Sequence, residues 1–372
     1  EINPVNINFF IYCPFNLTLW STDTHSFKSG DLYHLSFLNK LFNYYYRRTM
    51  PKPRNSQICL DSTPYYHCVS RCVRRAFLCG QDHHTNDDFD HRRQWLKERI
   101  FLLAEAFAID VCSYAIMSNH YHLVLHIDQH RVTSWTNQEV LERWHLVTAG
   151  TPLSHRALCG QPLTEGETFA IQNLIDKWRI RLSDISWFMK FLNEWIAKQA
   201  NKEDGCTGHF WESRFKSQAL LDEKALAAAM AYVDLNPIRA NIANSPETSD
   251  FTSIQDRINS VSEHGSQPNH LLPFTGNPTQ TETVGLPYKL IDYLSLVDWS
   301  GRSIVEGKRG AIPSDLPPIL TRLQISSANW LKLSQQLEAR FKTFIGDKHS
   351  IDNLQATLSL NRKPHCQSSL FR

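Results

Sequence analysis

The alternation of apolar and polar positions first indicates a strand at residues 65–71, whose sequence YYHCVSR is rich in strand-forming side chains. From His91 to Phe107 apolar residues recur at helical spacing with basic residues between them, which predicts an amphipathic helix with a basic outer side. Residues 110–117 and 120–127 predict two strands that a tight two-residue turn joins into a hairpin. The pattern therefore begins with a strand, a helix and a hairpin.

After the hairpin the pattern is less regular. Residues 128–182 carry glycines and prolines at irregular intervals, so they predict an insertion with some helix near Glu139 and Phe169. Ser183 then predicts the cap of a helix that keeps its apolar period through Lys198.

The next segment returns to short, well-marked elements. Residues 215–220 predict a strand, and Asp222 predicts the cap of a helix that Pro237 ends. The predicted order from Tyr65 is strand, helix, strand, strand, helix, strand, helix. This order indicates an α+β fold in which an antiparallel sheet carries helices packed on one face.

Composition divides the rest of the chain. Residues 246–287 are rich in Ser, Thr, Pro, Asn and Gln, which predicts a linker. Residues 288–345 regain a helical period and predict a small helical C-terminal extension that forms an accessory domain, and residues 346–372 predict a loose tail. We therefore expect the main domain to cover residues 50–245, with 128–182 as its insertion.

The first methionine of the 372-residue chain is Met50. Residues 1–49 show no clear period, whereas a polar segment that starts at Met50 leads into the first predicted strand. We expect residues 1–49 to be an upstream extension of the reading frame that is not part of the fold.

Charge and composition exclude several classes of protein. The chain is 42% hydrophobic and 20% charged, which supports a packed core and excludes disordered and fibrous classes. With 39 Lys and Arg against 37 Asp and Glu the formal charge is +2, so a nucleic acid must be bound by a local basic patch. No apolar segment reaches the ~20 residues of a membrane span, and no glycine-rich phosphate loop is present. The nine cysteines lack regular spacing and fit the reduced thiols of a cytoplasmic protein.

His120, Tyr121 and His122 form the first group with candidate chemistry. Residues two apart on a strand project from the same face, so both imidazoles can bind one metal ion while Tyr121 faces the core. Histidine is the commonest metal ligand among side chains. The alternative is a pair of histidines that only form hydrogen bonds on a half-buried strand, and the motif alone leaves both interpretations open.

Tyr232 and Asn236 form the second group. Because they are four residues apart, they lie one turn apart on the same edge of the predicted helix. A phenol with a carboxamide one turn away can present a nucleophile beside a metal ligand. Alternatively, Tyr232 is a boundary aromatic and Asn236 is a C-terminal cap before Pro237.

Basic residues provide the third signal. Arg214 and Lys216 alternate with Trp211 and Phe215, a pattern that suits single-stranded nucleic acid and equally an exposed edge strand. A second basic group either contacts a DNA backbone or forms a solvated face. Its members are Arg71, Arg74, Arg75, Arg92 and Arg93.

In this order, the motifs resemble the single-tyrosine HUH transposases. The resemblance rests on MSNHYHL at residues 117–123 and on YVDLNP at residues 232–237, and it extends from about Met50 to Asn244. Within that family the sequence is most similar to the REP-associated tyrosine transposases, which are relatives of the IS200-like transposases. The resemblance implies a ferredoxin-like HUH domain that cuts single-stranded DNA beside a hairpin and rejoins it.

The resemblance also implies a role for each motif. His120 and His122 match the metal ligands of the family. Asn236 matches the polar residue that completes the metal site, and Tyr232 matches the nucleophile. The metal is expected to be Mg²⁺ or Mn²⁺, which would polarise an oxygen of the scissile phosphate. Tyr232 would hold one DNA end as a phosphotyrosine ester, which conserves the energy of the broken bond for rejoining without ATP.

The expected partner is single-stranded or hairpin DNA, without a membrane, and the active form is either a monomer or a homodimer. An alternative function is that of a domesticated regulatory protein, which binds hairpin DNA without strand transfer. A nicking replication initiator is less favoured, because no helicase-like segment follows the motifs. The joint presence of His120, His122, Tyr232 and Asn236 favours the enzyme, since a protein that only binds DNA does not need all four.

Overall fold

The computed structural model describes residues 57–73, 78–80, 87–276, 284–304, 318–358, 364 and 367–371. The chain from Pro53 to Arg372 forms one compact unit. The expected upstream extension, residues 1–49, and the candidate interface residues Arg74 and Arg75 lie outside the described residues. No helix of the described part combines the length and the apolar character that a membrane crossing requires.

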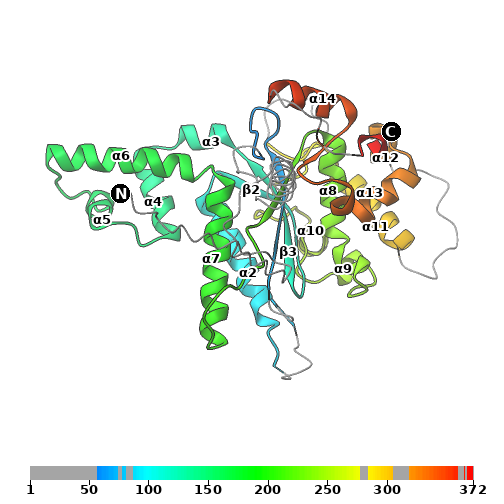
Figure 1. The fold of residues 1–372 in the computed structure, drawn as a ribbon, viewed down its shortest axis with the longest axis horizontal. Helices are drawn as coiled ribbons and strands as arrows, with labels where there is room; N and C mark the ends of the chain where they lie inside the picture. The colour runs from blue at the N-terminus through cyan, green and yellow to red at the C-terminus, as the bar shows by residue number, and fades with distance from the viewer. Residues whose placement is uncertain are drawn as a thin grey trace, which may run out of the picture. The chain divides into compact units, whose positions relative to one another are not determined.

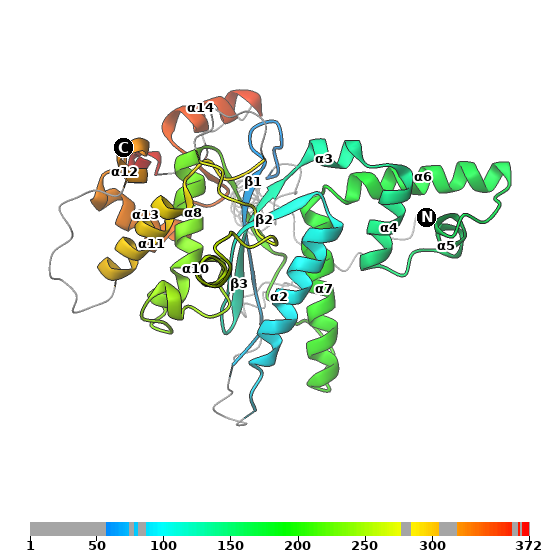
Figure 2. The same ribbon diagram turned by 180° about the vertical axis from the view of Figure 1, so that it is seen from behind.

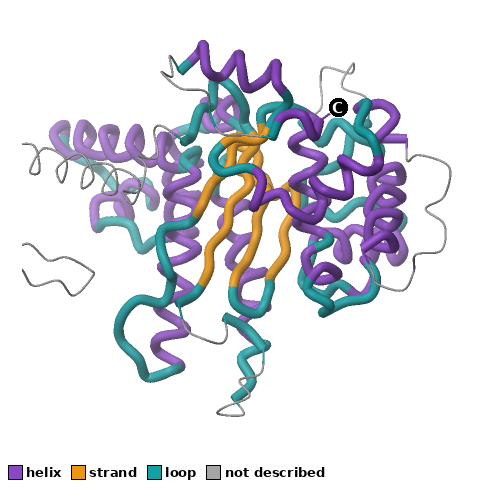
Figure 3. The backbone as a smooth tube through the Cα atoms, turned by 45° about the vertical axis from the view of Figure 1, so that its right-hand side comes forward, coloured by secondary structure: helices purple, strands orange, loops and turns teal. Residues whose placement is uncertain are grey.

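A five-stranded sheet in the order β2-β3-β1-β4-β5 runs through this unit (Figures 1 and 3). β1 pairs with β3 and β4 in antiparallel register, β2 pairs antiparallel with β3, and β5 runs parallel to β4. The first four strands confirm the predicted ones to within one residue, and β5 was not predicted. The strands are β1 (Tyr65–Arg71), β2 (Ile109–Ile116), β3 (His120–Ile127), β4 (Lys216–Leu220) and β5 (Phe344–Ile345).

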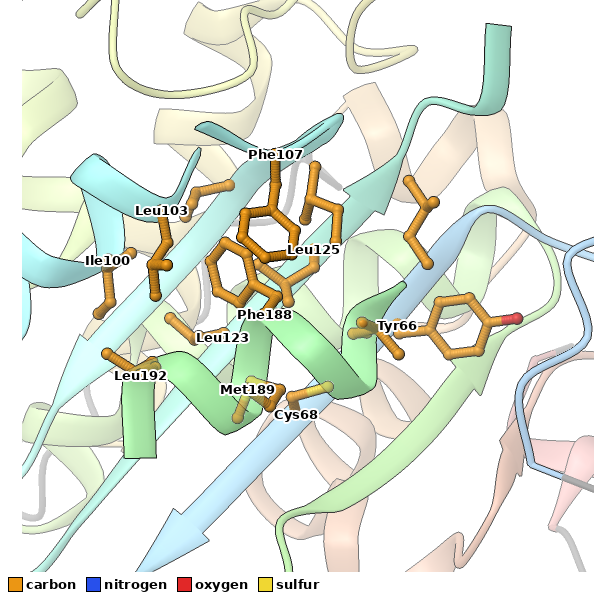
Figure 4. Close-up of a cluster of buried hydrophobic side chains, with 14 of the residues drawn as sticks. Tyr66, Cys68, Ile100, Leu103, Phe107, Leu123, Leu125, Phe188, Met189 and Leu192 are labelled. Atoms are coloured by element: carbon orange, nitrogen blue, oxygen red, sulfur yellow. The ribbon is translucent and has the colours of Figure 1, made fainter. Parts of the chain in front are cut away.

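Helices α2 (His91–Ala106) and α7 (Ile185–Glu203) cover one face of the sheet (Figure 2). Figure 4 shows how Leu123 and Leu125 of β3 pack there against Leu103 and Phe188 of the two helices. The helix predicted after Ser183 is α7, but its cap is Asp184, whose side chain accepts a hydrogen bond from the Ser186 amide. Alternate residues of β3 thus face an apolar core, as the strand pattern predicted.

Four helices fill residues 128–182, where the sequence predicted an irregular insertion. The glycines and prolines of this segment lie between the helices or begin them: Pro152 stands in the first turn of α5, and Gly150 has a positive φ of 65°. Trp144 of α4 stacks on Trp178 of α6 with ring centroids 5.1 Å apart, which joins the helices. The four are α3 (Gln129–Ser134), α4 (Asn137–Val147), α5 (Pro152–Leu158) and α6 (Glu165–Arg181).

The opposite face of the sheet is also covered by helices, which corrects the prediction of helices on one face only. α8 (Glu223–Asp234) lies against β2, β3 and β4, and α13 (Ser327–Arg340) packs on α8. Figure 1 shows α8, α11 and α13 on one side of the sheet and α2 and α7 on the other. The strands are therefore sandwiched between two helical layers, each with its own core.

Residues 246–287, predicted as a linker, contain a helix that packs on the sheet. In α10 (Ser253–His264) the buried Arg257 donates hydrogen bonds of 2.9 and 3.0 Å to the carbonyls of Cys112 and Leu272. Composition indicated a linker because polar residues dominate this segment, whereas in the structure Ile254 and Arg257 of α10 are both fully buried.

The C-terminal residues belong to the same compact unit and do not form a separate accessory domain. α11 (Leu290–Ile304) and α13 share a core with α8, and β5 extends the sheet. The segment predicted as a loose tail contains α14 (Lys348–Thr357). Near its end the side chains of Leu370 and Phe371 are buried. The remaining short helices are α9 (Asn236–Arg239), η2 (Pro246–Thr248), α12 (Pro318–Leu323) and η3 (Ser368–Phe371).

Candidate functional site

The two histidines of β3 lie on the sheet face that α8 covers. Tyr121, between them, points to the opposite face, where its hydroxyl donates a 2.6 Å hydrogen bond to Asn193. His122 is opposite Val69 of β1 and is almost fully buried, with 2% of its surface exposed. The alternation of the strand therefore places His120 and His122 on one face, as predicted.

A third histidine, His67 of β1, lies beside His122 and was missed by the sequence analysis. Its Nε2 is 3.0 Å from Nδ1 of His122, and the two rings stack with centroids 5.2 Å apart. The Gln218 amide nitrogen donates to the Phe341 carbonyl at 2.7 Å, so its oxygen accepts the 2.8 Å bond from Nδ1–H of His67. His67 therefore carries its proton on Nδ1 and directs the lone pair of Nε2 at His122.

Glu338 of α13 approaches the same two rings. Its Oε1 lies 3.3 Å from His122 Nδ1, and this buried oxygen makes no hydrogen bond of acceptable geometry. The donor atoms of His67, His122 and Glu338 all lie within 4.8 Å of one another. Among the His, Cys, Asp and Glu side chains of the described residues, this is the group of three that could hold a metal ion.

Tyr232 of α8 lies over the paired imidazoles. Its ring centroid is 6.0 Å from that of His67 and 5.8 Å from that of His122, with both rings approached edge-on. Two residues further along, the buried carboxylate of Asp234 accepts hydrogen bonds from Ser113 of β2 at 3.1 Å and from the Tyr293 hydroxyl at 2.5 Å. Asp234 thus ties the end of α8 to the sheet and to α11, which fixes where Tyr232 stands.

Arg239 of α9 covers the outer side of Tyr232. Its guanidinium carbon lies 3.6 Å from the centre of the tyrosine ring. Nη1 donates to the carbonyls of Ser334 and Gln335 at 3.3 and 3.2 Å, next to a break in α13 where Gln336 leaves helical geometry. Arg239 therefore links the tyrosine to the turn of α13 that precedes Glu338, while its buried Nε has no hydrogen-bond partner.

The other two predicted metal ligands have different surroundings. His120 donates a 2.5 Å hydrogen bond from Nδ1 to Oδ1 of Asn119, and its ring meets that of His122 edge-on with centroids 4.9 Å apart. Asn236 begins α9 and is buried, and its Nδ2 has no hydrogen-bond partner. The structure thus brings His122 together with His67 and Glu338, two residues that the predicted set did not include.

Burial keeps the imidazoles of this site in their neutral form. It lowers the pKa of His67, and together with the neighbouring His67 and His120 rings it lowers the pKa of His122 well below its ordinary value. Burial and the charges of Arg71 and Arg239 lower the pKa of His120 to about 4. Neutral imidazoles with available lone pairs are the form that binds metal ions.

The phenol of Tyr232 experiences two opposing influences. Burial raises its pKa, while the positive charge of Arg239 acts to lower it. An arginine held over the ring therefore favours the phenolate against the effect of burial.

The basic residues proposed from the sequence are dispersed. Arg92, expected on the outer side of its helix, is 1% exposed and its guanidinium binds Glu203 and Asp204 inside the protein. Arg93 pairs with Asp90 at 2.6 Å and donates to the Ile116 carbonyl at 3.2 Å. Three others are exposed: Arg71, Arg214 and Lys216.

Arg71 is the exposed basic residue next to the histidines. It ends β1 in register with His120, so the strand edge nearest the site carries a positive charge.

The sequence alone did not indicate His67, because its place beside His122 follows from the register that pairs Val69 with His122. Glu338 carried no signal either, because it stands alone in a helical segment far from the motifs.

Comparison with known proteins gives limited information. No protein-family model matches the chain, and no curated protein is similar to it in sequence. Among solved structures, a REP-associated tyrosine transposase bound to a REP hairpin is similar over 60% of this chain and 93% of its own, with 13% identity and a TM-score of 0.33. Likeness at this level assigns no activity, so the site must be interpreted from its own residues.

Proposed function

We propose that the chain is a metal-dependent tyrosine transposase, an enzyme that cleaves and rejoins single-stranded DNA next to hairpins. The observation that carries this proposal is the position of the Tyr232 phenol over two buried, neutral imidazoles on one sheet face. A potential nucleophile and a group that could hold a metal ion thus share one site, in a chain whose motifs follow the order of the single-tyrosine HUH transposases.

The sheet topology supports the ferredoxin-like HUH domain that this function requires. Strands β2, β3, β1 and β4 are adjacent in that order, with α2 between β1 and β2 and α7 between β3 and β4. This is the connectivity of the β-α-β-β-α-β motif. In this arrangement the helix after β4, which is α8, carries Tyr232 across the second face of the sheet.

The chemistry follows from the residues around the phenol. A bound Mg²⁺ or Mn²⁺ would supply Lewis-acid polarisation of a non-bridging oxygen of the scissile phosphate. Tyr232 gives its proton to water and forms a bond from its oxygen to phosphorus, while the bond from phosphorus to the leaving DNA oxygen breaks and that oxygen takes up a proton from water. Arg239, 3.6 Å from the ring, stabilises the phenolate before the attack. Reversal of the step rejoins the strand and releases Tyr232.

The ligands implied by the sequence resemblance are His120, His122 and Asn236, and His122 is also a member of the assembled group. Arg71, Arg214 and Lys216 are exposed and offer contacts to the DNA backbone. A single strand can bend into a site between a sheet and a helix more readily than a duplex, which supports single-stranded or hairpin DNA as the substrate.

The test is covalent capture of DNA. The full chain is incubated with Mn²⁺ and an end-labelled single strand that contains a hairpin, and protein-linked label is measured after denaturing electrophoresis. We expect an adduct with the unchanged chain and none with Tyr232→Phe, which removes only the attacking oxygen.

Tyr65→Phe is the matched control, because Tyr65 is also partly buried on this sheet face but contacts His126 instead, with ring centroids 4.9 Å apart and the rings tilted by 40°. An adduct that survives in Tyr232→Phe contradicts the assignment of the nucleophile. Hairpin binding without an adduct under any divalent ion supports the alternative of a DNA-binding regulatory protein, in which the raised pKa of Tyr232 would keep the phenol protonated.

A further inference from the structure

We propose that the divalent cation binds between β1, β3 and α13, on Nε2 of His67, Nδ1 of His122 and Oε1 of Glu338. In this arrangement the C-terminal region supplies one ligand of the metal centre. The role of the metal in DNA cleavage rests on the proposed function, but the binding of the metal does not.

The spacing of the three donor atoms fits one ion. An octahedral cation with bonds of about 2.0–2.1 Å places neighbouring donors about 2.9 Å apart and opposite donors about 4.2 Å apart. The distance from His67 to His122 is 3.0 Å, that from His122 to Glu338 is 3.3 Å, and all three atoms lie within 4.8 Å of one another. The distances therefore match neighbouring positions around one cation, and the two imidazoles have to turn away from their mutual hydrogen bond so that both lone pairs meet the ion.

The hydrogen bonds behind His67 prepare it as a ligand. The Gln218 amide nitrogen donates a hydrogen bond to the Phe341 carbonyl, and the Gln218 amide oxygen accepts one from Nδ1–H of His67. Such a second partner fixes the tautomer and ring orientation of a metal-binding histidine. Without a cation, His122 donates from Nδ1 to His67, and transfer of that proton to the other ring nitrogen frees Nδ1 without a change in charge.

The carboxylate of Glu338 carries an unsatisfied buried atom, as do the Asn236 amide and the Arg239 guanidinium. Oε1 of Glu338 is buried and has no hydrogen-bond partner, although a buried polar atom usually has one. A cation between this oxygen and the two imidazoles would satisfy it. The break of α13 at Gln336 and the bonds from Arg239 to Ser334 and Gln335 set the turn on which Glu338 stands.

The donor set suits the proposed chemistry. Two imidazole nitrogens and one carboxylate oxygen bind Mn²⁺ well and leave positions open for water and a phosphate oxygen. The Glu338 side chain is 30% exposed whereas the His67 and His122 rings are buried, so the carboxylate is the member of this group that lies nearest to solvent.

The test measures Mn²⁺ binding to the full chain without DNA, from the loss of the electron paramagnetic resonance signal of the free ion. We expect Glu338→Gln to weaken Mn²⁺ binding at least tenfold, because a neutral carboxamide replaces the charged ligand at almost the same volume. Glu263→Gln is the matched control, since Glu263 is an exposed carboxylate beside His264 in α10 and should leave the affinity unchanged. Thermal unfolding without metal verifies that both variants fold.

His120→Ala and Asn236→Ala separate this site from the one that the sequence resemblance implies. Weakened binding in these two variants, with unchanged binding in Glu338→Gln, would overturn the proposal. A failure of the unchanged chain to bind Mn²⁺ would overturn it as well. Weakened Mn²⁺ binding in Glu338→Gln would support the metal centre, whether or not the unchanged chain forms a DNA adduct. Absence of the adduct would contradict only the proposed function, so the two failures are distinguishable.

Discussion

The two faces of the sheet bury side chains of different kinds. Under α2 and α7 the strands present Leu123 and Leu125 to other apolar side chains such as Phe188. Under α8 and α13 the same strands present His67 and His122, and each of these buried rings has a polar partner. The first face contributes stability mainly through apolar contact area, whereas the second combines an apolar core with hydrogen bonds that satisfy its buried polar side chains.

This difference teaches where the chain can tolerate change. An apolar core responds to lost volume, and a polar site responds to the loss of a single donor or acceptor. Substitutions on the first face should therefore alter the free energy of unfolding, and those on the second should alter chemistry before stability.

The largest expected effect is on the apolar face. Phe188→Ala removes a fully buried ring from the core under α2 and α7, and we expect a loss of about 3–5 kcal/mol in the free energy of unfolding, measured by urea denaturation. Phe169→Ala is the control, because Phe169 is 73% exposed on α6 and should change this free energy by less than about 0.5 kcal/mol. Equal losses in both variants would contradict the assigned core.

A smaller loss of stability with a larger loss of function is expected on the polar face. Asp234→Asn keeps the shape of the side chain. The carboxamide accepts fewer hydrogen bonds than the carboxylate, which accepts from the hydroxyls of Ser113, Ser253 and Tyr293. We expect a cost of about 1–3 kcal/mol in the free energy of unfolding. Because Asp234 positions the end of α8, the rate of DNA adduct formation should fall as well.

The matched control for Asp234→Asn is Asp298→Asn, which changes an exposed carboxylate of α11 that pairs only with Arg302. It should leave both the adduct rate and the unfolding free energy close to those of the unchanged chain. An adduct rate that is normal in Asp234→Asn would show that Tyr232 is positioned by other contacts.

The smallest expected effect on stability belongs to the exposed basic residues. Arg214→Ala should change the unfolding free energy by less than about 0.5 kcal/mol. If Arg214 contacts a DNA phosphate, the slope of log affinity against log salt should fall by roughly one. Binding of a hairpin-containing single strand, measured at several salt concentrations, gives this slope.

Arg302→Ala removes another exposed arginine, on α11, and should leave the salt slope unchanged. A slope that is the same in Arg214→Ala and in the unchanged chain would remove Arg214 from the proposed interface.

The first four strands could be predicted because strand-forming residues and the hairpin turn are local signals. The hairpin at residues 110–127 and the cap at Asp222 follow from local signals that tertiary contacts do not alter. The second helical layer could not be predicted in the same way. α10 is held by the buried guanidinium of Arg257, and a helix with few apolar positions resembles a linker in composition.

The candidate site shows the same limit. His120, His122 and Tyr232 lie within short motifs, and the structure places all three on one sheet face or over it. His67 could be inferred only after the register of β1 against β3 was known. Glu338 depends on the packing of α13 against α8, which no local pattern encodes.

The parallel pairing of β4 with β5 has a consequence for the newly made chain. Ala219 of β4 pairs with Phe344 of β5. This edge of β4 therefore cannot form its backbone hydrogen bonds until β5, which is synthesised much later, is present. Chains emerge from the ribosome with the N-terminal part first, and contacts between distant residues form late. Tyr232 therefore leaves the ribosome well before Glu338 and the strand that follows it. Until then the growing protein contains the proposed nucleophile but not Glu338, so the proposed metal centre can be complete only after the segment that carries α13 has been made.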